Sequence, residues 1–483
     1  MSNVKKLMMS AAGGGAGAFA GVLTDNSAYQ RTTFGEDVAM DSTGNYYFLS
    51  RVWTSTRYTY VTKIDSVGTI LQAVRVAGVN FEGSSICIDS SDNIYVGGRG
   101  GTGSQMPMVI KWNSSFTLQW AYAYNYASSA WNLTQPGNNS ATGIATDDSS
   151  IWLVGTMPVS GFGDRGFYLK AACSNGDVEY AQNFYRQSSG SQHYAHSVVV
   201  NSNYVYVGGY NPNENENFVN VFNKGNSLKK GNTDAIEIGN ASASNDGYGA
   251  ELTVKDDGTV YAIAGYQDTS NSRRIAAVVE LNSSSSLTGN YHMYGTNNTY
   301  SSFYHGSVVH TENGDLALFG DFNDSSGSIN THKAVVMSVD DGLTSTINYA
   351  DSYHLTGNYS DGSTNEVRLG LGNGGRKIIM SKDGTHIVGI GTYQSFNQSS
   401  SNTNIDHAFI FSHPVDGVGS GGAVNAGGLQ VFGNINTVDS STQPWSSSSF
   451  SLSNLTNDMA KQSESSNLTI NTSYSMYNEI YTY

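Results

Sequence analysis

One pattern of polar and apolar positions recurs along the chain. A short polar turn precedes a run in which aromatic and aliphatic residues alternate, and the run usually ends in glycine. Period-2 alternation bounded by such turns indicates β-strands. The spacing between most copies, about 48 to 70 residues, is typical of propeller blades. Seven copies begin at Asp41, Asp89, Asp147, Asn201, Asp256, Glu312 and Lys382.

Three further strand-like segments accompany each copy, one before it and two after it; in the first repeat they span 37–40, 58–64 and 69–76. Consecutive strands with Asn, Asp or Gly at the turns predict antiparallel hairpins. A sheet of four strands cannot bury both faces alone, so the sheets are expected to pack radially. The prediction is an all-β, seven-bladed β-propeller with four-stranded antiparallel blades. Two or three β-sandwiches are the alternative, but they do not explain seven copies of one pattern.

The blades are expected to begin near residues 36, 83, 141, 195, 247, 305 and 368. Three regions follow: a glycine-rich N-terminal arm (1–35), the propeller (36–439) and a serine-rich C-terminal extension (440–483). Each repeat supplies four strands in chain order, with 429–435 as the fourth strand of blade seven. The ring is therefore expected to close by packing blade seven on blade one, without pairing of the chain ends. The extension could be disordered, wrap the ring or pair with another subunit.

Charge narrows the choice of partners. The formal net charge is −15, and charged residues make up 13% of the chain, against about 25% in an average globular protein. An acidic surface repels phosphate backbones, so nucleic acid is not an expected partner. No apolar run approaches the ~18 residues of a membrane span, so no membrane association is expected. Cys87 and Cys173 occupy positions of their repeats that do not correspond, and both are interpreted as free thiols.

The N-terminal arm has two interpretations. Lys5 and Lys6 precede an apolar stretch that ends in a small-residue site before Gly21, which is the outline of a secretory signal. The glycines at 13–15 and 17 weaken the helix that such a signal needs. The alternative is a docking arm, because its apolar side chains would be buried against a neighbouring protein. Deleting 1–22 should then leave a folded ring. The candidate assembly anchors are Leu7, Met8, Met9 and Phe19.

The repeats resemble those of a known group of proteins. Residues 37–47 (DVAMDSTGNYY) and 60–71 (YVTKIDSVGTIL) are similar to repeats of seven-bladed propellers in bacterial surface proteins and in virion proteins of tailed marine bacteriophages such as cyanophages. Residues 6–15 (KLMMSAAGGG) are similar to the start of several such phage structural proteins. The resemblance covers 36 to about 436 for the blades and 1–22 for the leader. The drift of the later repeats leaves the border of blade seven open.

This resemblance implies a non-enzymatic virion protein: a tail fibre, spike or nozzle component, or a head decoration. Its expected partners are other virion proteins and host-surface glycans, with a homo-oligomer in the particle. The alternative is a secreted or surface-displayed bacterial propeller that acts as a lectin or a carbohydrate-active enzyme. Retention of residues 1–20 in the native protein would favour the virion, and their loss would favour secretion.

No motif for catalysis stands out in the sequence. The glycine run at 97–101 lacks the Lys-Ser/Thr of a phosphate loop, and no His-Glu-x-x-His or Cys-x-x-Cys pattern occurs. Asp41, Asp89 and Asp147 recur at one repeat position, where they would lie far apart around a ring, so a role in capping turns is favoured over catalysis. We therefore expect neither a catalytic residue nor a metal or organic cofactor.

Long loops between blades carry the candidate ligand-binding residues. Aromatic side chains there are interspersed with Ser and Asn, a combination suited to stacking on sugars and adaptable hydrogen bonding. The alternative is that these aromatics only pack the loops over the blades. The candidates are Tyr126, Trp131, His193, Tyr194, Tyr300, Phe303 and Tyr304.

Overall fold

The recurring aspartates shape the hairpin turns between the first two strands of the early blades. In the computed structural model, Asp41 Oδ1 accepts hydrogen bonds from the backbone N–H groups of Thr43 at 3.0 Å and Asn45 at 2.9 Å. Asp89 makes the equivalent contacts at 3.0 and 2.8 Å. In a tighter turn, Asp147 Oδ1 accepts from the N–H groups of Ser149 at 3.1 Å and Ser150 at 2.8 Å. These bonds hold the turn backbone locally, which confirms the turn role predicted for all three residues.

The structure describes most of the ring. No helix in the part of the chain that it describes is long and apolar enough to cross a membrane. The described residues are 19–24, 32–53, 57–77, 80–101, 106–126, 140–159, 163–185, 192–212, 216–225, 235–238, 249–268, 273–284, 286–295, 301–324, 331–343, 346–353, 355–358, 364–367, 377–395, 405–417, 429–431, 436–437, 445–448, 451–454, 459–463, 469–471 and 477–482.

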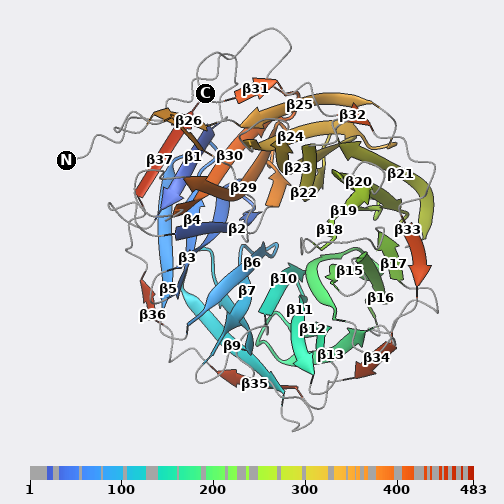
Figure 1. Ribbon diagram of the computed structural model, residues 1–483. Helices are drawn as coiled ribbons and strands as arrows, with labels where there is room; N and C mark the ends of the chain where they lie inside the picture. Colours follow the sequence, from blue (N-terminus) through green and yellow to red (C-terminus); the bar gives the residue numbers. More distant parts are fainter. Residues whose placement is uncertain are drawn as a thin grey trace.

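Seven antiparallel sheets surround a central axis (Figure 1). Blade one comprises β2 (Thr32–Met40), β3 (Tyr46–Trp53), β4 (Arg57–Ile64) and β5 (Ile70–Ala77). Blade two comprises β6 (Glu82–Ile88), β7 (Ile94–Gly100), β8 (Met106–Trp112) and β9 (Leu118–Tyr126). Blade three comprises β10 (Ser140–Thr146), β11 (Ser150–Val159), β12 (Gly163–Ala172) and β13 (Val178–Tyr185). Blade four comprises β14 (Tyr194–Val200), β15 (Tyr204–Asn211), β16 (Glu216–Asn223) and β17 (Ala235–Ile238).

The remaining blades follow the same plan. Blade five comprises β18 (Glu251–Val254), β19 (Val260–Asp268), β20 (Arg273–Leu281) and β21 (Leu287–Gly295). Blade six comprises β22 (Ser301–His310), β23 (Asp315–Asp324), β24 (Thr331–Asp340) and β25 (Ile347–Tyr353). A separate hairpin, β26 (Leu355–Asn358) and β27 (Thr364–Val367), precedes β28 (Lys377–Met380), β29 (His386–Ser395) and β30 (Ile405–Pro414) of blade seven. The seven-bladed, four-stranded plan is confirmed, and the first six blades begin within four residues of the predicted positions.

The predicted mode of closure is wrong. The fourth strand of blade seven is β1 (Phe19–Thr24), which pairs antiparallel with β30, so that Phe19 lies opposite Ser412. Phe19, Ala20 and Leu23 are fully buried. An edge strand with a free row of backbone groups needs a partner, and β1 supplies it from the other end of the chain. Phe19 therefore belongs to the ring and is not available as an assembly anchor, and deleting 1–22 would remove part of blade seven.

The C-terminal part of the chain adds a fifth, outermost strand to every blade. We call these strands, β31 to β37, the C-terminal belt. They lie at the periphery of the ring (Figure 1) and pair with blades six, five, four, three, two, one and seven in that order, opposite to the order of the blades in the sequence. The belt comprises β31 (Leu429–Val431), β32 (Asn436–Thr437), β33 (Trp445–Ser448), β34 (Ser451–Asn454), β35 (Met459–Ser463), β36 (Thr469–Asn471) and β37 (Tyr477–Thr482).

The belt changes two predictions. Residues 429–431 pair with β25 of blade six, so they are not the fourth strand of blade seven as predicted. Of the three arrangements left open for the extension, wrapping of the ring is the one observed for its described strands. At the end of the belt, β37 pairs with β1, which therefore lies between β30 and β37. Both ends of the described chain thus meet in blade seven.

Candidate functional site

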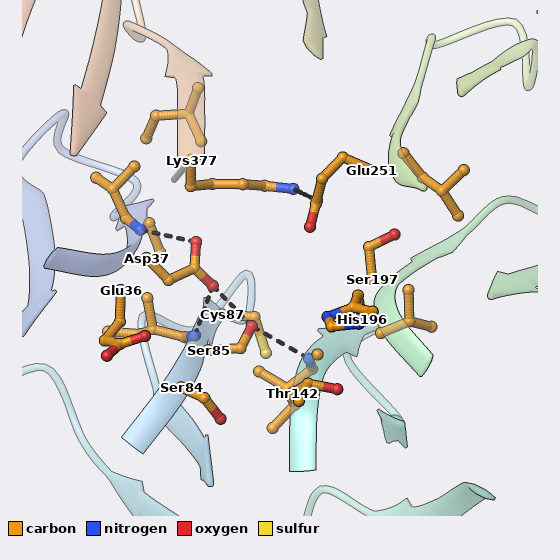
Figure 2. Close-up of a pocket in the computed structure, with 18 of the residues that line it drawn as sticks. Glu36, Asp37, Ser84, Ser85, Cys87, Thr142, His196, Ser197, Glu251 and Lys377 are labelled. Carbon is orange, nitrogen blue, oxygen red and sulfur yellow. Dashed lines mark hydrogen bonds and ion pairs between the residues drawn. The ribbon is translucent and has the colours of Figure 1, made fainter. Parts of the chain in front are cut away.

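A cavity of about 850 Å³ lies at the axis of the ring. Residues of the innermost strands of all seven blades line it: β2, β6, β10, β14, β18, β22 and β28. Its volume is in the range of about 300 to 1,000 Å³ that is usual for ligand sites. Figure 2 shows its polar side chains converging from different blades.

A repeated β-bulge supplies much of the cavity lining. In β2, β6, β10, β14 and β22 the register with the next strand skips one residue at the same place in the repeat. A bulge leaves the extra residue out of the ladder and re-aims its side chain. The five bulged residues all line the cavity, and they are Glu36, Ser84, Thr142, His196 and Gly306. Burial lowers the pKa of His196 to about 4, so its imidazole is neutral at pH 7.

After four of the five bulges, the side chain of the next residue links neighbouring blades. Asp37 Oδ2 accepts hydrogen bonds from the Ser85 hydroxyl at 2.7 Å and from the backbone N–H of Ile86 at 2.9 Å. The Ser85 hydroxyl in turn accepts one from the N–H of Ile144 at 3.2 Å. These bonds satisfy buried backbone donors on the strand edges that face the axis. Because burial disfavours its charge, the pKa of Asp37 is raised above its usual value. Asp37 therefore has a clear structural role.

One ion pair crosses from blade seven to blade five, which are not neighbours in the ring. Lys377 Nζ lies 3.3 Å from Glu251 Oε2 (Figure 2). Burial raises the pKa of Glu251. Burial also opposes the charge of Lys377, but Glu251 and Asp37 outweigh it and raise the pKa of the lysine. The Lys377 ammonium thus interacts electrostatically with two carboxylates, Glu251 and Asp37. These three residues connect blades one, five and seven across the axis.

A cluster of arginine and glutamate side chains lies between blades one and two. Arg51 Nη1 and Arg99 Nη2 contact the same oxygen of Glu82, Oε2, at 3.2 and 2.9 Å, and Arg57 contacts Oε1. Arg51 Nη2 also lies 2.7 Å from Glu36 Oε1. Burial disfavours the charge of Glu82, but the hydrogen bonds from Arg99 and Arg57 hold its pKa below the usual value. Three guanidinium groups therefore contact two carboxylates, Glu36 and Glu82, where blades one and two meet.

The register of the strands explains why these side chains meet. Arg51 lies in β3 opposite Phe34, the residue two before Glu36 in β2, and Arg99 in β7 lies directly opposite Glu82 in β6. Glu82 begins β6, Arg51 and Arg99 lie near the ends of β3 and β7, and Glu36 is the bulged residue in the middle of β2. Glu36, Arg51, Glu82 and Arg99 line the axial cavity. These four residues form one wall of the cavity.

The candidate loop residues separate into different environments. His193 is fully buried, its ring centroid lies 5.7 Å from that of Phe218, and its backbone N–H donates to the Asp164 carbonyl at 3.0 Å. The ring is thus a packing element and is not presented to a ligand. Tyr194 is half-buried, and its hydroxyl donates to Asp164 Oδ2 at 3.0 Å.

Three of the other predicted site residues are placed by the strands that contain them. Phe303 and Tyr304 lie in strand β22, opposite Phe322 and Asp321, and not in a loop. Tyr126 is the last residue of β9, opposite Met459 of the belt. Trp131, Tyr300, Leu7, Met8 and Met9 lie outside the described residues.

The sequence carried a signal for the cavity that the search for motifs missed. In a chain with only 13% charged residues, Glu36, Asp37, Glu82 and Lys377 stand in or beside the short strands predicted to be innermost. A charged residue that faces an axis is costly unless it is paired. No group of three or more His, Cys, Asp or Glu side chains among the described residues is arranged to hold a metal ion. Cys87 and Cys173 are free thiols, as predicted, and Cys87 lines the cavity.

Comparison with known proteins adds likeness of fold only. No family model and no curated protein matches the chain. A subtype N10 neuraminidase-like protein from a little yellow-shouldered bat isolate is 10% identical, with a TM-score of 0.40 over 83% of this chain and 99% of that one. The parainfluenza virus 5 hemagglutinin-neuraminidase ectodomain is 8% identical, with a TM-score of 0.39 over 81% and 82%. The WD40 domain of SCAP from fission yeast is 11% identical, with a TM-score of 0.31 over 82% and 99%.

Proposed function

We propose that this chain is a non-enzymatic structural protein of a bacteriophage virion. In this role the propeller is a rigid module in the tail or on the head, and it contacts other virion proteins or the host surface. The likeness of the repeats and of residues 6–15 to phage virion proteins motivates the proposal.

The observation that carries the proposal is the double closure of the ring. Strand β1 completes blade seven from the N-terminal side, and the belt adds a strand to each of the seven blades. A belt that pairs with every blade ties the whole ring together, because no blade can detach without breaking backbone hydrogen bonds to the belt. Such a ring suits a particle that must persist outside the cell.

The state of the cavity carboxylates supports a role other than acid–base catalysis. Most glycoside hydrolases use a pair of carboxyl groups, one able to donate a proton and one able to act as base or nucleophile. Here Glu251 pairs with Lys377, Asp37 accepts hydrogen bonds from blade two, and Glu36 and Glu82 pair with arginines. Each carboxylate already has a structural partner.

The test is the composition of purified particles. Particles of the phage that encodes the chain would be purified on a density gradient and analysed by mass spectrometry. We expect propeller and belt peptides at a stoichiometry similar to that of other tail or head proteins. Absence of the chain from particles would overturn the virion role. Depolymerisation of host polysaccharide by the purified protein would overturn the non-enzymatic part.

The alternative, a secreted or surface-displayed lectin, is favoured by the polar axial cavity. N-terminal sequencing of the native protein separates the two roles. Cleavage before Gly21 would remove Phe19 and Ala20, which are buried in blade seven. We therefore expect both residues to be retained, and their loss would favour secretion.

A further inference from the structure

We propose that the segment before β1, residues 1–18, docks on the outer edge of blade one. The docking surface is an apolar patch formed by Val67 and Leu71, which are 46% and 51% exposed. Residues 1–18 lie outside the described part of the chain, whereas the patch and the point at which the segment leaves the ring lie inside it. Docking within one chain is measured without particles, so this inference and the virion role can fail independently.

Blade one carries apolar residues at two exposed positions where other blades carry polar residues or glycine. The first position is the residue of the fourth strand that the register skips, which is Leu71 in blade one and Gln119, Glu179 and Asn348 in blades two, three and six. The second is the turn residue whose N–H donates to the Asp or Asn side chain two positions earlier, which is Val67 in blade one and Ser115, Ser284 and Gly342 in blades two, five and six. All of these residues are exposed. The patch is therefore a property of blade one and does not belong to the common plan of the repeat.

The backbone beside this patch is an open strand edge. Within the described part of the chain, belt strand β36 pairs with β5 only from Arg75 to Ala77, and no other strand pairs with the outer edge of β5 from Ile70 to Val74. An open edge presents N–H and C=O groups that can take up a further strand. The belt already pairs with the rest of this edge, so a further strand would continue an existing arrangement. The edge and the patch together fit an extended apolar segment.

The segment leaves the ring beside this surface. Phe19, the first residue of β1, belongs to the apolar cluster that joins blade seven to blade one, and Ile70, the neighbour of Leu71, packs against the same cluster. Phe19 lies opposite Ser412, two residues before β30 ends. Val67 stands in the turn that follows β4. Because β4 and β30 are the third strands of their blades, Phe19 and Val67 lie at the same end of the ring.

The sequence of the segment suits the surface. Residues 7–18 (LMMSAAGGGAGA) contain no charged side chain, and Leu7, Met8 and Met9 are the large apolar residues among them. Methionine is flexible and adapts to irregular surfaces, and glycine lets one backbone approach another closely. Residues 10–18 span at most about 30 Å when extended, and sheets packed face to face lie about 10 Å apart. The three apolar residues can therefore reach blade one from Phe19.

Hydrogen exchange of the full chain tests the docking, by comparison with a variant that lacks residues 2–16 and keeps β1. The outward-facing amides of β5 between Ile70 and Val74 should exchange about threefold faster in the variant, because a docked terminal segment is weakly held and its loss reopens the edge. The matched control is the edge of β25 between Ile347 and Ala350, which β31 does not cover and whose skipped residue is Asn348. Exchange there should not change. Unchanged exchange in β5, or an equal change at both edges, would overturn the inference.

Leu71→Gln tests the patch, because it gives blade one the residue that stands at the equivalent position of blade two. In the full chain it should raise exchange in β5 about twofold, since part of the docking contact is lost. In the variant lacking residues 2–16 the same substitution should have no further effect. The matched control, Gln119→Ala in blade two, should leave exchange in β5 unchanged. Equal effects of Leu71→Gln with and without the segment would contradict docking on Leu71.

Leu7→Cys, Met8→Cys and Met9→Cys, each combined with Leu71→Cys, identify the chain that supplies the segment. With oxidised glutathione, at least one of the three pairs should form a disulfide within one chain, which migrates as a monomer on a non-reducing gel. The single substitutions in the segment are the control for linkage to the two native thiols, and they should form no such disulfide. A disulfide that joins two chains would assign the edge to a second copy. That result, or no disulfide in any pair, would overturn docking within one chain.

Discussion

Strand β1 completes the ring, and Leu23→Ala tests how much it contributes to stability. The Leu23 side chain is fully buried in a cluster that joins blade seven to blade one and includes Val38, Phe48 and Ile410. Its backbone lies opposite Ala408 of β30 on one side and Asn478 of the belt on the other. Because β1 is held on both edges, the surrounding strands cannot easily collapse into the space that the missing atoms leave.

The expected loss of unfolding free energy is about 2–5 kcal/mol, the range for a leucine removed from a packed core. A loss of this size raises the population of molecules with an open blade seven by roughly 30-fold to several thousand-fold. The matched control is Leu71→Ala in β5. The Leu71 side chain is 51% exposed, so the same chemical change should alter stability by at most about 0.5 kcal/mol.

Two measurements check this prediction. Urea denaturation gives the free energy of unfolding of both variants. Hydrogen exchange at β30, between Ala408 and Ser412, reports opening of the β1 edge directly. In Leu23→Ala these amides should exchange faster than in the wild type, and in Leu71→Ala they should not. Equal destabilisation by the two substitutions, or unchanged exchange in β30, would refute closure by β1.

Three further predictions concern the turns, the cavity and the belt. The Tyr95 hydroxyl donates to Asp89 Oδ2 at 2.9 Å in a buried position, so Tyr95→Phe should destabilise the protein by about 1–3 kcal/mol in urea melts; an unchanged midpoint would contradict this. The pKa of His196 is lowered from 6.5 to about 4, so as the pH falls the unfolded state takes up a proton on this ring before the folded state does. The free energy of unfolding should therefore decrease between pH 6.5 and pH 4; an NMR titration of the ring with a midpoint near 6.5 would disprove this. Truncation after residue 439 removes β33 to β37 and exposes the outer edges of five blades, so the product should self-associate in light scattering; a monomer at the same concentration would count against a protective belt.

The blades could be predicted from the sequence because their determinants are local. Each blade is a set of consecutive hairpins, so strand alternation and turn residues a few positions apart specify it. Asp41 and Asp89 show this plainly, since each bonds to backbone N–H groups two and four residues later. Repetition reinforced the signal, because seven weak local patterns at a regular spacing exclude most other architectures.

Tertiary structure alone decided how the ring closes and which charges meet. The belt strands are short, and most of their partners lie more than 200 residues away, as in the pairing of Thr469 with Ala77. Backbone hydrogen bonds, which any sequence can make, specify that pairing, so the side chains carry little trace of it. The arginine cluster is non-local in part, because Arg51 of blade one reaches Glu82 of blade two only when the two blades pack side by side. Local patterns thus determined the blades, and contacts between distant segments determined the closure of the ring and the character of its cavity.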